Sequence, residues 1–302
     1  MQPAPVAILG ATGFIGRHLA ARLAVNGIPV TGISRSREAR IDGVSHWQTP
    51  DSLDLANHQA VVNLSGERVD CRWTPARREI LEHSRIEVTQ RLVGHLRSLD
   101  PAERPAVLLN GSGVGYYGDG GDSPLNESAP AGTDFLAKLC VDWENAALEA
   151  TSFDTRVILL RTGIVLGKGG AAFDKLRKLF ALGLGGKLGS GRQWMPWIHL
   201  DDEVSAIVHA IETPTLHGPL NLAAPQPERN ADFTRKLAAA VHRPAFFHAP
   251  AFALKLALGE FANALLTGQR AVPAALEKSG FTFRHPTLES ALADLIGEST
   301  KH

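Results

Sequence analysis

Three glycines at three-residue spacing, Gly10, Gly13 and Gly16, are the feature that most constrains the fold of this chain. They follow an apolar run over residues 6–9 and precede a helical apolar pattern over residues 15–23. This order predicts a strand, a tight turn and a helix. One glycine permits the turn, one lets the backbone approach a pyrophosphate, and one lets the helix pack on the strand. The helix N-terminus offers free N–H groups to a phosphate, so the stretch predicts a dinucleotide site. We expect the cofactor to contact these residues of the turn: Gly10, Thr12, Gly13, Phe14, Ile15 and Gly16.

The end of the next expected strand, residues 29–33, indicates which dinucleotide is bound. Enzymes that prefer NAD usually place Asp or Glu about 20 residues past the glycines, where the carboxylate holds the ribose 2′-hydroxyl. This chain has Ser34 and Arg35 there. A carboxylate would repel a 2′-phosphate, whereas a hydroxyl and a guanidinium bind one. These residues predict NADP(H); the alternative interpretation is a charged loop that faces solvent.

Apolar runs and helical patterns alternate as far as about residue 165. The expected strands cover residues 43–50, 60–64, 106–110 and 156–160, and the expected helices cover residues 74–99 and 134–149. Such alternation is typical of a parallel sheet with helices on both faces. We therefore predict the α/β class, with a Rossmann-type doubly wound parallel sheet and a smaller, mainly helical C-terminal lobe.

The later part of the chain changes character. It predicts a strand over residues 219–223, a helix over 232–241, a short strand or turn over 279–285 and a last helix over 288–296. We expect an NADP(H)-binding domain over residues 1–242, with substrate-lobe segments within 166–215, and a C-terminal domain over residues 243–302.

The composition excludes several partners. The chain has 302 residues, 44% of them hydrophobic, with 31 Lys and Arg against 31 Asp and Glu. A neutral balance gives no reason to expect nucleic acid or an anionic membrane as partner. Cys71 and Cys140 have no metal or disulfide spacing, so we expect free thiols, no bound metal and a reducing compartment. The first strand follows Met1 closely, which predicts no signal peptide and a cytoplasmic protein.

Ligands of a doubly wound sheet lie beyond the carboxyl ends of its strands. The strand over residues 60–64 therefore points the following residues toward the cofactor: Asn63, Leu64, Ser65, Gly66 and Glu67. The strand over residues 106–110 leads into the glycine-rich stretch 111–119, which contains Ser112 and the only two tyrosines, Tyr116 and Tyr117. Farther on, residues 193–204 place two tryptophans and a histidine before an acidic helix start. We interpret that stretch as a lid or pocket wall, with Asp201 and Asp202 as helix caps.

Several motifs together resemble a known superfamily. The turn at 10–16, Y-G-D at 117–119, Arg161 after a strand, and W-I-H-L-D-D-E-V at 197–204 resemble the extended short-chain dehydrogenase/reductases. N-L-S-G-E at 63–67, S-R at 84–85 and R-T-G-I-V-L-G at 161–167 are similar to one atypical branch, a nucleoside-diphosphate-sugar epimerase family. Members of that branch end in a C-terminal domain of unknown function, which the stretch 265–273 resembles.

The resemblance implies NADP(H) binding with Ser34 and Arg35 at the 2′-phosphate and further contacts from Leu64, Ser65 and Arg85. Without it, Arg85 would be interpreted as a surface residue. Relatives act on small molecules such as nucleotide sugars and often form homodimers through two long helices. We therefore expect a small-molecule substrate, with a nucleotide sugar as the candidate, and a homodimer.

The catalytic residues of the superfamily are not all present. Its enzymes use a tyrosine as acid and base, with a lysine four residues later that lowers the pKa of the phenol. The two corresponding positions hold Phe135 and Leu139 in one register, or Leu136 and Cys140 in another. Neither pair transfers a proton as the dyad does.

The remaining catalytic candidates are hydroxyl groups. Ser112 matches the family's serine if the double tyrosine contains one inserted residue; the other register puts Gly113 there. Tyr116 or Tyr117 would supply a proton from a different direction. Glu67 and His199 are further polar candidates near the expected crevice.

Two functions follow from these residues. The first is an NADP(H)-dependent oxidoreductase or epimerase, in which Ser112 with Tyr116 or Tyr117 handles the substrate oxygen. The second is an NADP(H)-binding regulator or redox sensor without turnover, which the missing Tyr-x-x-x-Lys dyad favours.

Overall fold

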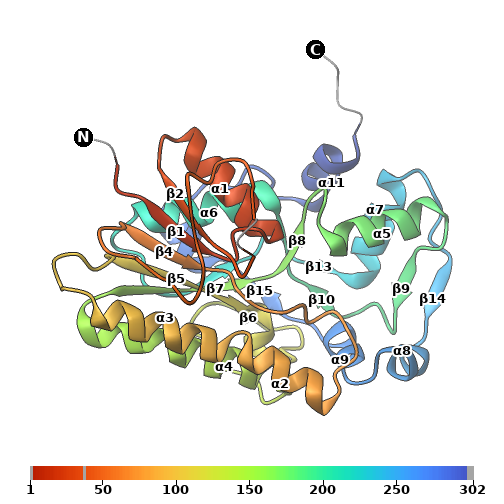
Figure 1. Ribbon diagram of the computed structural model, residues 1–302. Helices are drawn as coiled ribbons and strands as arrows, with labels where there is room; N and C mark the ends of the chain where they lie inside the picture. The colour runs from red at the N-terminus through yellow and green to blue at the C-terminus, as the bar shows by residue number, and fades with distance from the viewer. Residues whose placement is uncertain (1–2, 37–38, 298–302) are drawn as a thin grey trace.

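The computed structural model describes residues 3–36 and 39–297. Its centre is a parallel sheet of seven strands in the order β12-β7-β5-β4-β1-β2-β3 (Figure 1). The strands are β1 (Val6–Leu9), β2 (Val30–Ile33), β3 (His46–Gln48), β4 (Ala60–Asn63), β5 (Val107–Gly113), β7 (Arg156–Thr162) and β12 (Gly218–Leu222). β1, β2 and β4 are buried along their whole length, as strands covered on both faces must be. The predicted doubly wound parallel sheet is confirmed.

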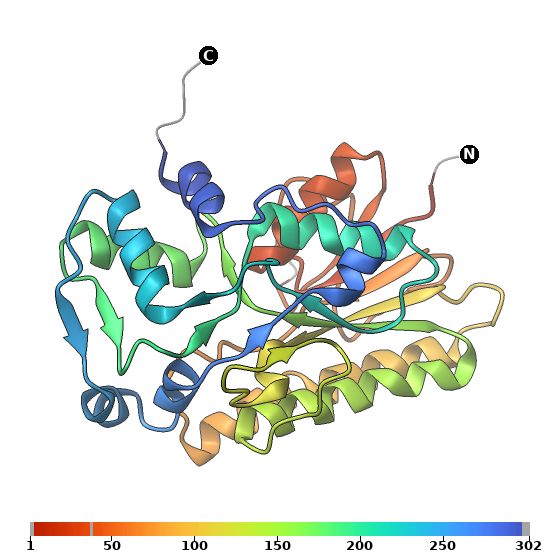
Figure 2. The same cartoon turned by 180° about the vertical axis from the view of Figure 1, so that it is seen from behind.

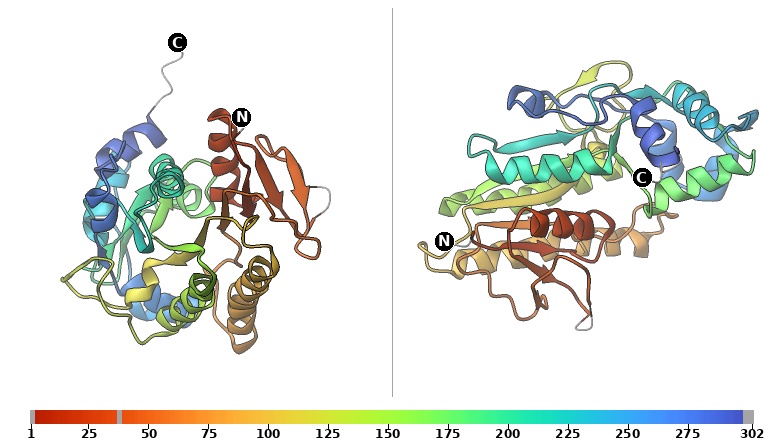
Figure 3. Two further views of the ribbon diagram at one scale, coloured as in Figure 1. Left: turned by 90° about the vertical axis from the view of Figure 1, so that its left-hand side faces the viewer. Right: turned by 90° about the horizontal axis from the view of Figure 1, so that it is seen from above.

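Helices cover both faces of the sheet (Figure 3). On one face, α1 (Phe14–Val25) packs beside α6 (Leu200–Glu212), and their apolar residues share one core with the sheet. On the other face lie α3 (Ile86–Ser98) and α4 (Phe135–Leu148), which build a second core. Two short 3-10 helices, η1 (Val114–Tyr117) and η2 (Glu149–Phe153), follow β5 and α4.

The prediction of a single helix over residues 74–99 is wrong, because the structure has two helices there. Thr74 caps α2 (Pro75–His83) by accepting the N–H of Arg77, and the chain then breaks before α3. At the break, the Ser84 hydroxyl donates to the carbonyl of Leu81 and accepts the backbone N–H of Glu67. The break thereby ties the helix pair to the loop after β4 and turns Arg85 toward that loop.

The smaller lobe lies at one end of the sheet and is mainly helical (Figures 1 and 2). It contains α5 (Ala171–Ala181), β9 (Gly186–Leu188), β10 (Trp194–Met195), β13 (Glu228–Arg229), α7 (Asn230–Ala240), β14 (Phe247–Ala249), α8 (Ala251–Leu258), α9 (Phe261–Leu266) and α11 (Leu288–Ile296). Phe173, Phe180, Phe233 and Leu292 form part of its core. The turn alternative for residues 279–285 is confirmed, since no strand forms there.

Two short strand pairs and one short helix connect the lobe with the sheet. β8 (Ile164–Leu166) pairs with β11 (Trp197–His199), and β6 (Pro124–Leu125) pairs with β15 (Arg270–Ala271). α10 (Ala274–Lys278) buries Leu276 in the main core. Within the described residues, no helix has the length and apolar character needed to cross a bilayer.

Candidate functional site

The turn after β1 is built around close backbone contacts. Gly10 has a φ of +80°, and a Cβ there would lie 2.9 Å from the carbonyl oxygen of Leu64. A Cβ on Gly16 would lie 2.3 Å from the carbonyl oxygen of Gly10, so neither position accepts a side chain. Gly13 is the N-cap of α1 and brings no side-chain cap, and the first turn of α1 holds no acidic residue. The N–H groups at the start of α1 are therefore not capped by a side chain, which is the arrangement that suits a pyrophosphate.

The other residues of the turn lie around this point. Thr12 is exposed, while Phe14 and Ile15 are half-buried. The Phe14 ring contacts the loop after β8, because Cβ atoms on Gly167 and Gly170 would lie 2.8 and 2.7 Å from it. Phe14 therefore fixes the start of α1 against the base of the smaller lobe.

Ser34 and Arg35 follow β2 at the same edge of the sheet. The Ser34 hydroxyl accepts the backbone N–H of Ser36, and the Arg35 side chain is 87% exposed. Arg35 lies 3.5 Å from the Glu67 carboxylate, which also lies 3.6 Å from Arg77. An exposed guanidinium beside a hydroxyl fits a 2′-phosphate.

The buried side chain of Asn63 holds the loop after β4 in place. Asn63 is fully buried, and its amide donates to Thr89 and Asn110 while its oxygen accepts the backbone N–H of Ser65. Asn63 therefore orients Ser65 and does not itself face the crevice. The Leu64 carbonyl lies against Gly10, which brings this loop next to the glycine turn.

Arg85 lies beside the same loop and is not a free surface residue. Its guanidinium donates to the carbonyl of Glu67 at 2.7 Å and lies 5.2 Å from the Trp143 ring. A Cβ on Gly66 would approach this guanidinium to 3.0 Å. Burial lowers the pKa of Arg85, but the group stays a cation near neutrality. The structure thus brings Arg85, Gly66 and Glu67 together.

Ser112 points into a buried polar network beneath the end of β5. Its hydroxyl donates to Glu144 Oε1 at 2.6 Å. Arg161 at the end of β7 holds the same carboxylate with two hydrogen bonds of 2.8 Å, and this pair is almost fully buried. Two parallel N–H···O bonds fix both side chains, so Ser112 is held in one orientation.

The two tyrosines differ in their surroundings. Tyr117 is buried, donates its hydroxyl to Asn221 at 2.7 Å and accepts a hydrogen bond from Arg161 at 3.1 Å. Burial raises the pKa of Tyr117 above its ordinary value, although Arg161 opposes the shift. Tyr116 is half-buried, its ring lies 3.4 Å from the Arg161 guanidinium carbon, and its hydroxyl has no partner among the described residues. Tyr116 is therefore the phenol whose hydroxyl has no hydrogen-bond partner within residues 3–36 and 39–297.

The two candidate pairs of dyad positions on α4 have different surroundings. Leu136 lies over Gly115, and the Cys140 thiol donates to the carbonyl of Gly113 at 3.7 Å, so both face the end of β5. Phe135 instead packs on Trp73. Burial raises the pKa of Cys140 to about 11, so the thiol stays protonated near neutrality. Neither residue transfers a proton in place of the dyad.

A second buried acid lies below the end of β7. Glu203, in the first turn of α6, is fully buried and accepts the Thr162 hydroxyl at 3.0 Å. Its second oxygen has no partner among the described residues. Burial raises the pKa of Glu203 to about 8, so this acid is neutral at physiological pH.

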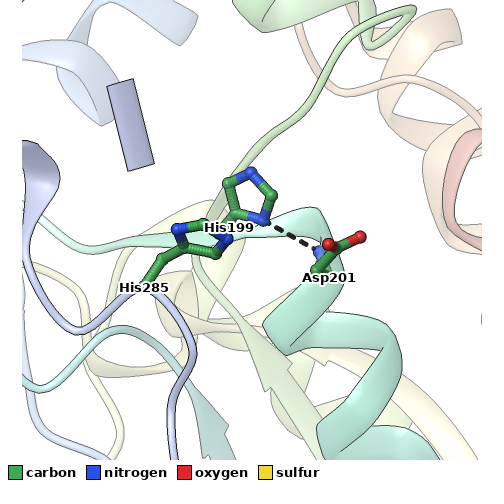
Figure 4. Close-up of side chains that lie close together, drawn as sticks. All are labelled: His199, Asp201 and His285. Carbon is green, nitrogen blue, oxygen red and sulfur yellow. Dashed lines mark hydrogen bonds between the residues drawn. The ribbon is translucent and has the colours of Figure 1, made fainter. Parts of the chain in front are cut away.

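His199, Asp201 and His285 come together at the start of α6 (Figure 4). The expectation that both aspartates cap this helix is wrong, because His199 Nδ1 accepts the N–H of Asp201 and is the cap. The centroids of the His199 and His285 rings lie 3.9 Å apart, with the ring planes tilted by 37°. Burial, and then the His285 ring, lowers the pKa of His199, which keeps the cap neutral.

The three side chains lie within 4.8 Å of one another, the spacing of a metal site. The Nδ1 atom of His199 is already used, and the Asp201 carboxylate pairs with Arg284 at 3.1 Å. This cluster is therefore a helix cap joined to the last part of the chain.

The tryptophans of residues 193–204 divide between core and surface. Trp197 is fully buried, so the pocket-wall interpretation is wrong for it. Trp194 lines a cavity of about 250 Å³ together with Asp122, Arg192 and Arg229. Arg229 lies 4.5 Å from the Trp194 ring and 2.8 Å from the Asp122 carboxylate. An aromatic ring flanked by cations is a suitable surface for a planar, anionic ligand.

Sequence reasoning did not identify four residues of this region: Glu144, Asn221, Thr162 and Glu203. Glu144 and Glu203 lie on helices that read as ordinary amphipathic helices, and only their pairing with Arg161 and Thr162 reveals them. The single signal in the sequence was Arg161 itself, a charged residue at the end of an apolar strand.

Comparisons with known proteins show the family of this chain. The model of the NAD dependent epimerase/dehydratase family matches residues 6–223, and that of a domain of unknown function, DUF1731, matches residues 249–295. An epimerase family protein of Mycobacterium bovis is 44% identical over 299 residues, which cover 97% of each chain.

Two solved structures are also similar. Human epimerase family protein SDR39U1, solved with NADPH, is 33% identical with a TM-score of 0.89, covering 97% of this chain and 99% of that one. UDP-glucuronic acid 4-epimerase from Bacillus cereus, solved with UDP-glucuronic acid and NAD, shares the fold. It is 19% identical with a TM-score of 0.73, covering 97% of this chain and 96% of its own. The resemblance noted in the sequence is confirmed: this chain belongs to the NAD-dependent epimerase/dehydratase family, among the SDR39U1-like members with a C-terminal DUF1731 domain.

Proposed function

We propose that this chain is an NADP(H)-dependent oxidoreductase or epimerase that acts on a small polar substrate. The observation that carries the proposal is the uncapped start of α1 behind a turn that accepts no side chains, with Arg35 exposed beside Ser34. The human relative was solved with NADPH, which supports the choice of the phosphorylated cofactor. We keep the cytoplasm as the expected compartment because both cysteines are free thiols.

Different residues around the turn would bind different parts of the cofactor. Backbone N–H groups from Gly13 onward would hold the pyrophosphate, and Ser34 with Arg35 would hold the 2′-phosphate. Leu64 to Glu67 would lie along the cofactor, with Arg85 fixing that loop through the Glu67 carbonyl. When bound, NADP(H) supplies a nicotinamide carbon that donates or accepts a hydride.

We assign the proton transfer to Tyr116. Ser112 and Tyr117 already donate their hydroxyl protons to Glu144 and Asn221. We therefore assign these two residues a structural role in the buried network. Among the described residues the Tyr116 hydroxyl has no partner, and its ring is held against Arg161, which fixes its direction. In this proposal the Tyr116 hydroxyl exchanges a proton with the substrate oxygen, and the buried network keeps Arg161 in place.

A nucleotide sugar is the proposed substrate class. The cavity around Trp194 offers an aromatic surface for a base and the cations Arg192 and Arg229 for a diphosphate. The Bacillus cereus epimerase of the same fold was solved with UDP-glucuronic acid, which is consistent with this choice. A homodimer through α3 and α4 stays a prediction.

Rapid-mixing absorbance at the reduced nicotinamide band tests the proposal. Enzyme with bound NADPH or NADP is mixed with a panel of nucleotide sugars and carbonyl compounds, and we expect at least one to change the absorbance. Tyr116→Phe should slow that change at least a hundredfold, whereas Tyr117→Phe should slow it less and lower thermal stability. Full activity in Tyr116→Phe would refute the assignment of the proton.

The second candidate is an NADP(H)-binding regulator or redox sensor without turnover. It is favoured by one observation, that Leu136 and Cys140 face the end of β5 where the dyad would lie. Tight NADPH binding together with no absorbance change across the whole panel would support this candidate against the enzyme.

A further inference from the structure

The exposed apolar residues of this chain are concentrated in one place. Within residues 3–36 and 39–297, nine large hydrophobic side chains are exposed, and seven of them lie in residues 179–184 and 246–256. The most exposed of these seven are Phe246 at 89%, Leu256 at 78% and Phe252 at 76%. Isolated exposed apolar residues are ordinary, but a group of this size marks an interaction site.

The fold brings these two segments together. β9 and β14 pair in parallel, with Phe247 opposite Gly186, so the loop that carries Leu182 and Leu184 meets the start of β14. At its other end β14 leads through Pro250 into α8, a helix in which no residue is buried. Figures 1 and 2 both show β9, β14 and α8 in the smaller lobe at one end of the molecule. We call this surface the apolar end and define it by Leu182, Leu184, Phe246, Phe252 and Leu256.

A basic cavity opens beside the apolar end. Its volume is about 390 Å³, and its lining includes Lys187, Arg235, Arg243, Phe246 and Phe247. None of the described residues that line it is acidic. Arg235 pairs with Asp232 outside the cavity, whereas Lys187 forms no ion pair within the described part of the chain. The cavity therefore offers positive charge and an aromatic wall, which suits a phosphate that is attached to an apolar group.

The charge around the apolar end selects its partner. Residues 171–188 and 231–258 contain eight Lys and Arg and only two Asp and Glu, although the whole chain is balanced. A second copy of the chain placed symmetrically on this surface would bring like charges together. An anionic lipid surface instead attracts the basic residues and accepts the Phe and Leu side chains at its headgroup boundary.

We propose that the apolar end docks on an anionic phospholipid bilayer, with lipid phosphates in the basic cavity. Phe246, Phe252 and Leu256 enter the acyl boundary, while Lys187 and Arg243 contact headgroups. The lobe that carries this surface also carries the Trp194 cavity, so docking holds the proposed substrate site close to the membrane.

Flotation of the full chain with vesicles tests the proposal. We expect binding to vesicles of phosphatidylcholine with phosphatidylglycerol, and at least tenfold less binding to phosphatidylcholine alone. Phe246→Ser with Phe252→Ser, and separately Lys187→Glu with Arg243→Glu, should each reduce binding at least tenfold. Matched controls are Val25→Ser, which removes an apolar side chain that is 85% exposed on α1, and Arg91→Glu, which reverses a cation that is 78% exposed on α3. Both controls should bind as the unchanged chain does.

Other outcomes distinguish a lipid bilayer from the other candidate occupants of this surface. Circular dichroism and NADPH affinity check that each variant is folded. Equal binding to both kinds of vesicle, or no binding to either, would overturn the proposal. Light scattering without lipid would assign the surface to a second copy instead if it showed a dimer that dissociates in the Phe246→Ser variant. If inorganic phosphate at millimolar concentration binds the unchanged chain but anionic vesicles do not, the cavity takes free phosphate and the membrane proposal fails.

Discussion

The buried acid Glu203 should make the stability of this protein fall as the pH rises. Its carboxyl group is fully buried, has the Thr162 hydroxyl as its partner, and has no cation within hydrogen-bond distance among the described residues. Burial raises its pKa to about 8, whereas Glu in an unfolded chain titrates at about 4.3. Between these two values the native state keeps a proton that the unfolded state has released. The free energy of unfolding must therefore decrease with rising pH in this window.

The magnitude follows from the size of the shift. One pKa unit corresponds to about 1.4 kcal/mol, so Glu203 lowers the free energy of unfolding by up to about 3 kcal/mol between about pH 5 and about pH 7.5. Glu203→Gln removes this titration and keeps the shape of the side chain. An unpaired amide adds a cost of about 1–3 kcal/mol, but that cost is the same at every pH. The difference between the two pH dependences therefore isolates the acid.

Urea unfolding followed by far-UV circular dichroism measures both dependences. We expect the unchanged chain to lose about 2–3 kcal/mol more than Glu203→Gln between about pH 5 and about pH 7.5. Glu212→Gln, an exposed position at the other end of α6, is the control and should follow the unchanged chain. Parallel curves for the unchanged chain and Glu203→Gln would show that the acid is not held neutral by burial, and the reasoning would fail.

Three further predictions concern the cofactor site and the buried network. Arg35→Glu puts a carboxylate beside Ser34 and should weaken NADPH binding at least tenfold, about 1.4 kcal/mol, in calorimetric titrations, with little change for NADH; equal losses for both cofactors would contradict the role of Arg35. Gly16→Ala places a methyl group 2.3 Å from a backbone oxygen and should abolish NADPH binding, whereas Gly94→Ala, with open space around it on α3, should bind normally. Normal NADPH affinity in Gly16→Ala would disprove the geometry of the turn. Arg161→Met leaves the Glu144 carboxylate buried without its cation and should cost about 3–5 kcal/mol in urea unfolding, and the added change Glu144→Gln should restore part of the loss; equally unstable single and double variants would count against the pair.

Local patterns predicted most of the sheet and helices correctly. The strand expected over residues 60–64 is β4, and the helix expected over 288–296 is α11, because periodicity and capping act over a few residues. The division of the helix at Ser84 was not predictable in this way. It depends on the backbone of Glu67, which lies 17 residues earlier in the chain.

The same limit applies to the site. The glycine turn is a contiguous signal, and the chain belongs to an NAD-dependent family, one human member of which was solved with NADPH. The network of Ser112, Glu144 and Arg161 joins residues from β5, α4 and β7, so no spacing in the sequence reveals it. The balanced net charge likewise gave no reason to expect an anionic membrane as partner. A sum over 302 residues does not show that the charged residues are unevenly distributed along the chain.

The hydrogen bonds of Asp202 have a consequence for protein synthesis. Its carboxylate is buried in the first turn of α6 and accepts the backbone N–H groups of Arg284 and His285 at 2.7 and 2.9 Å. Those donors are translated 82 and 83 residues later. While they are still inside the ribosome, the nascent α6 has a carboxylate at its core-facing surface without partners. Firm seating of this helix on the sheet therefore waits until Arg284 and His285 have left the ribosome.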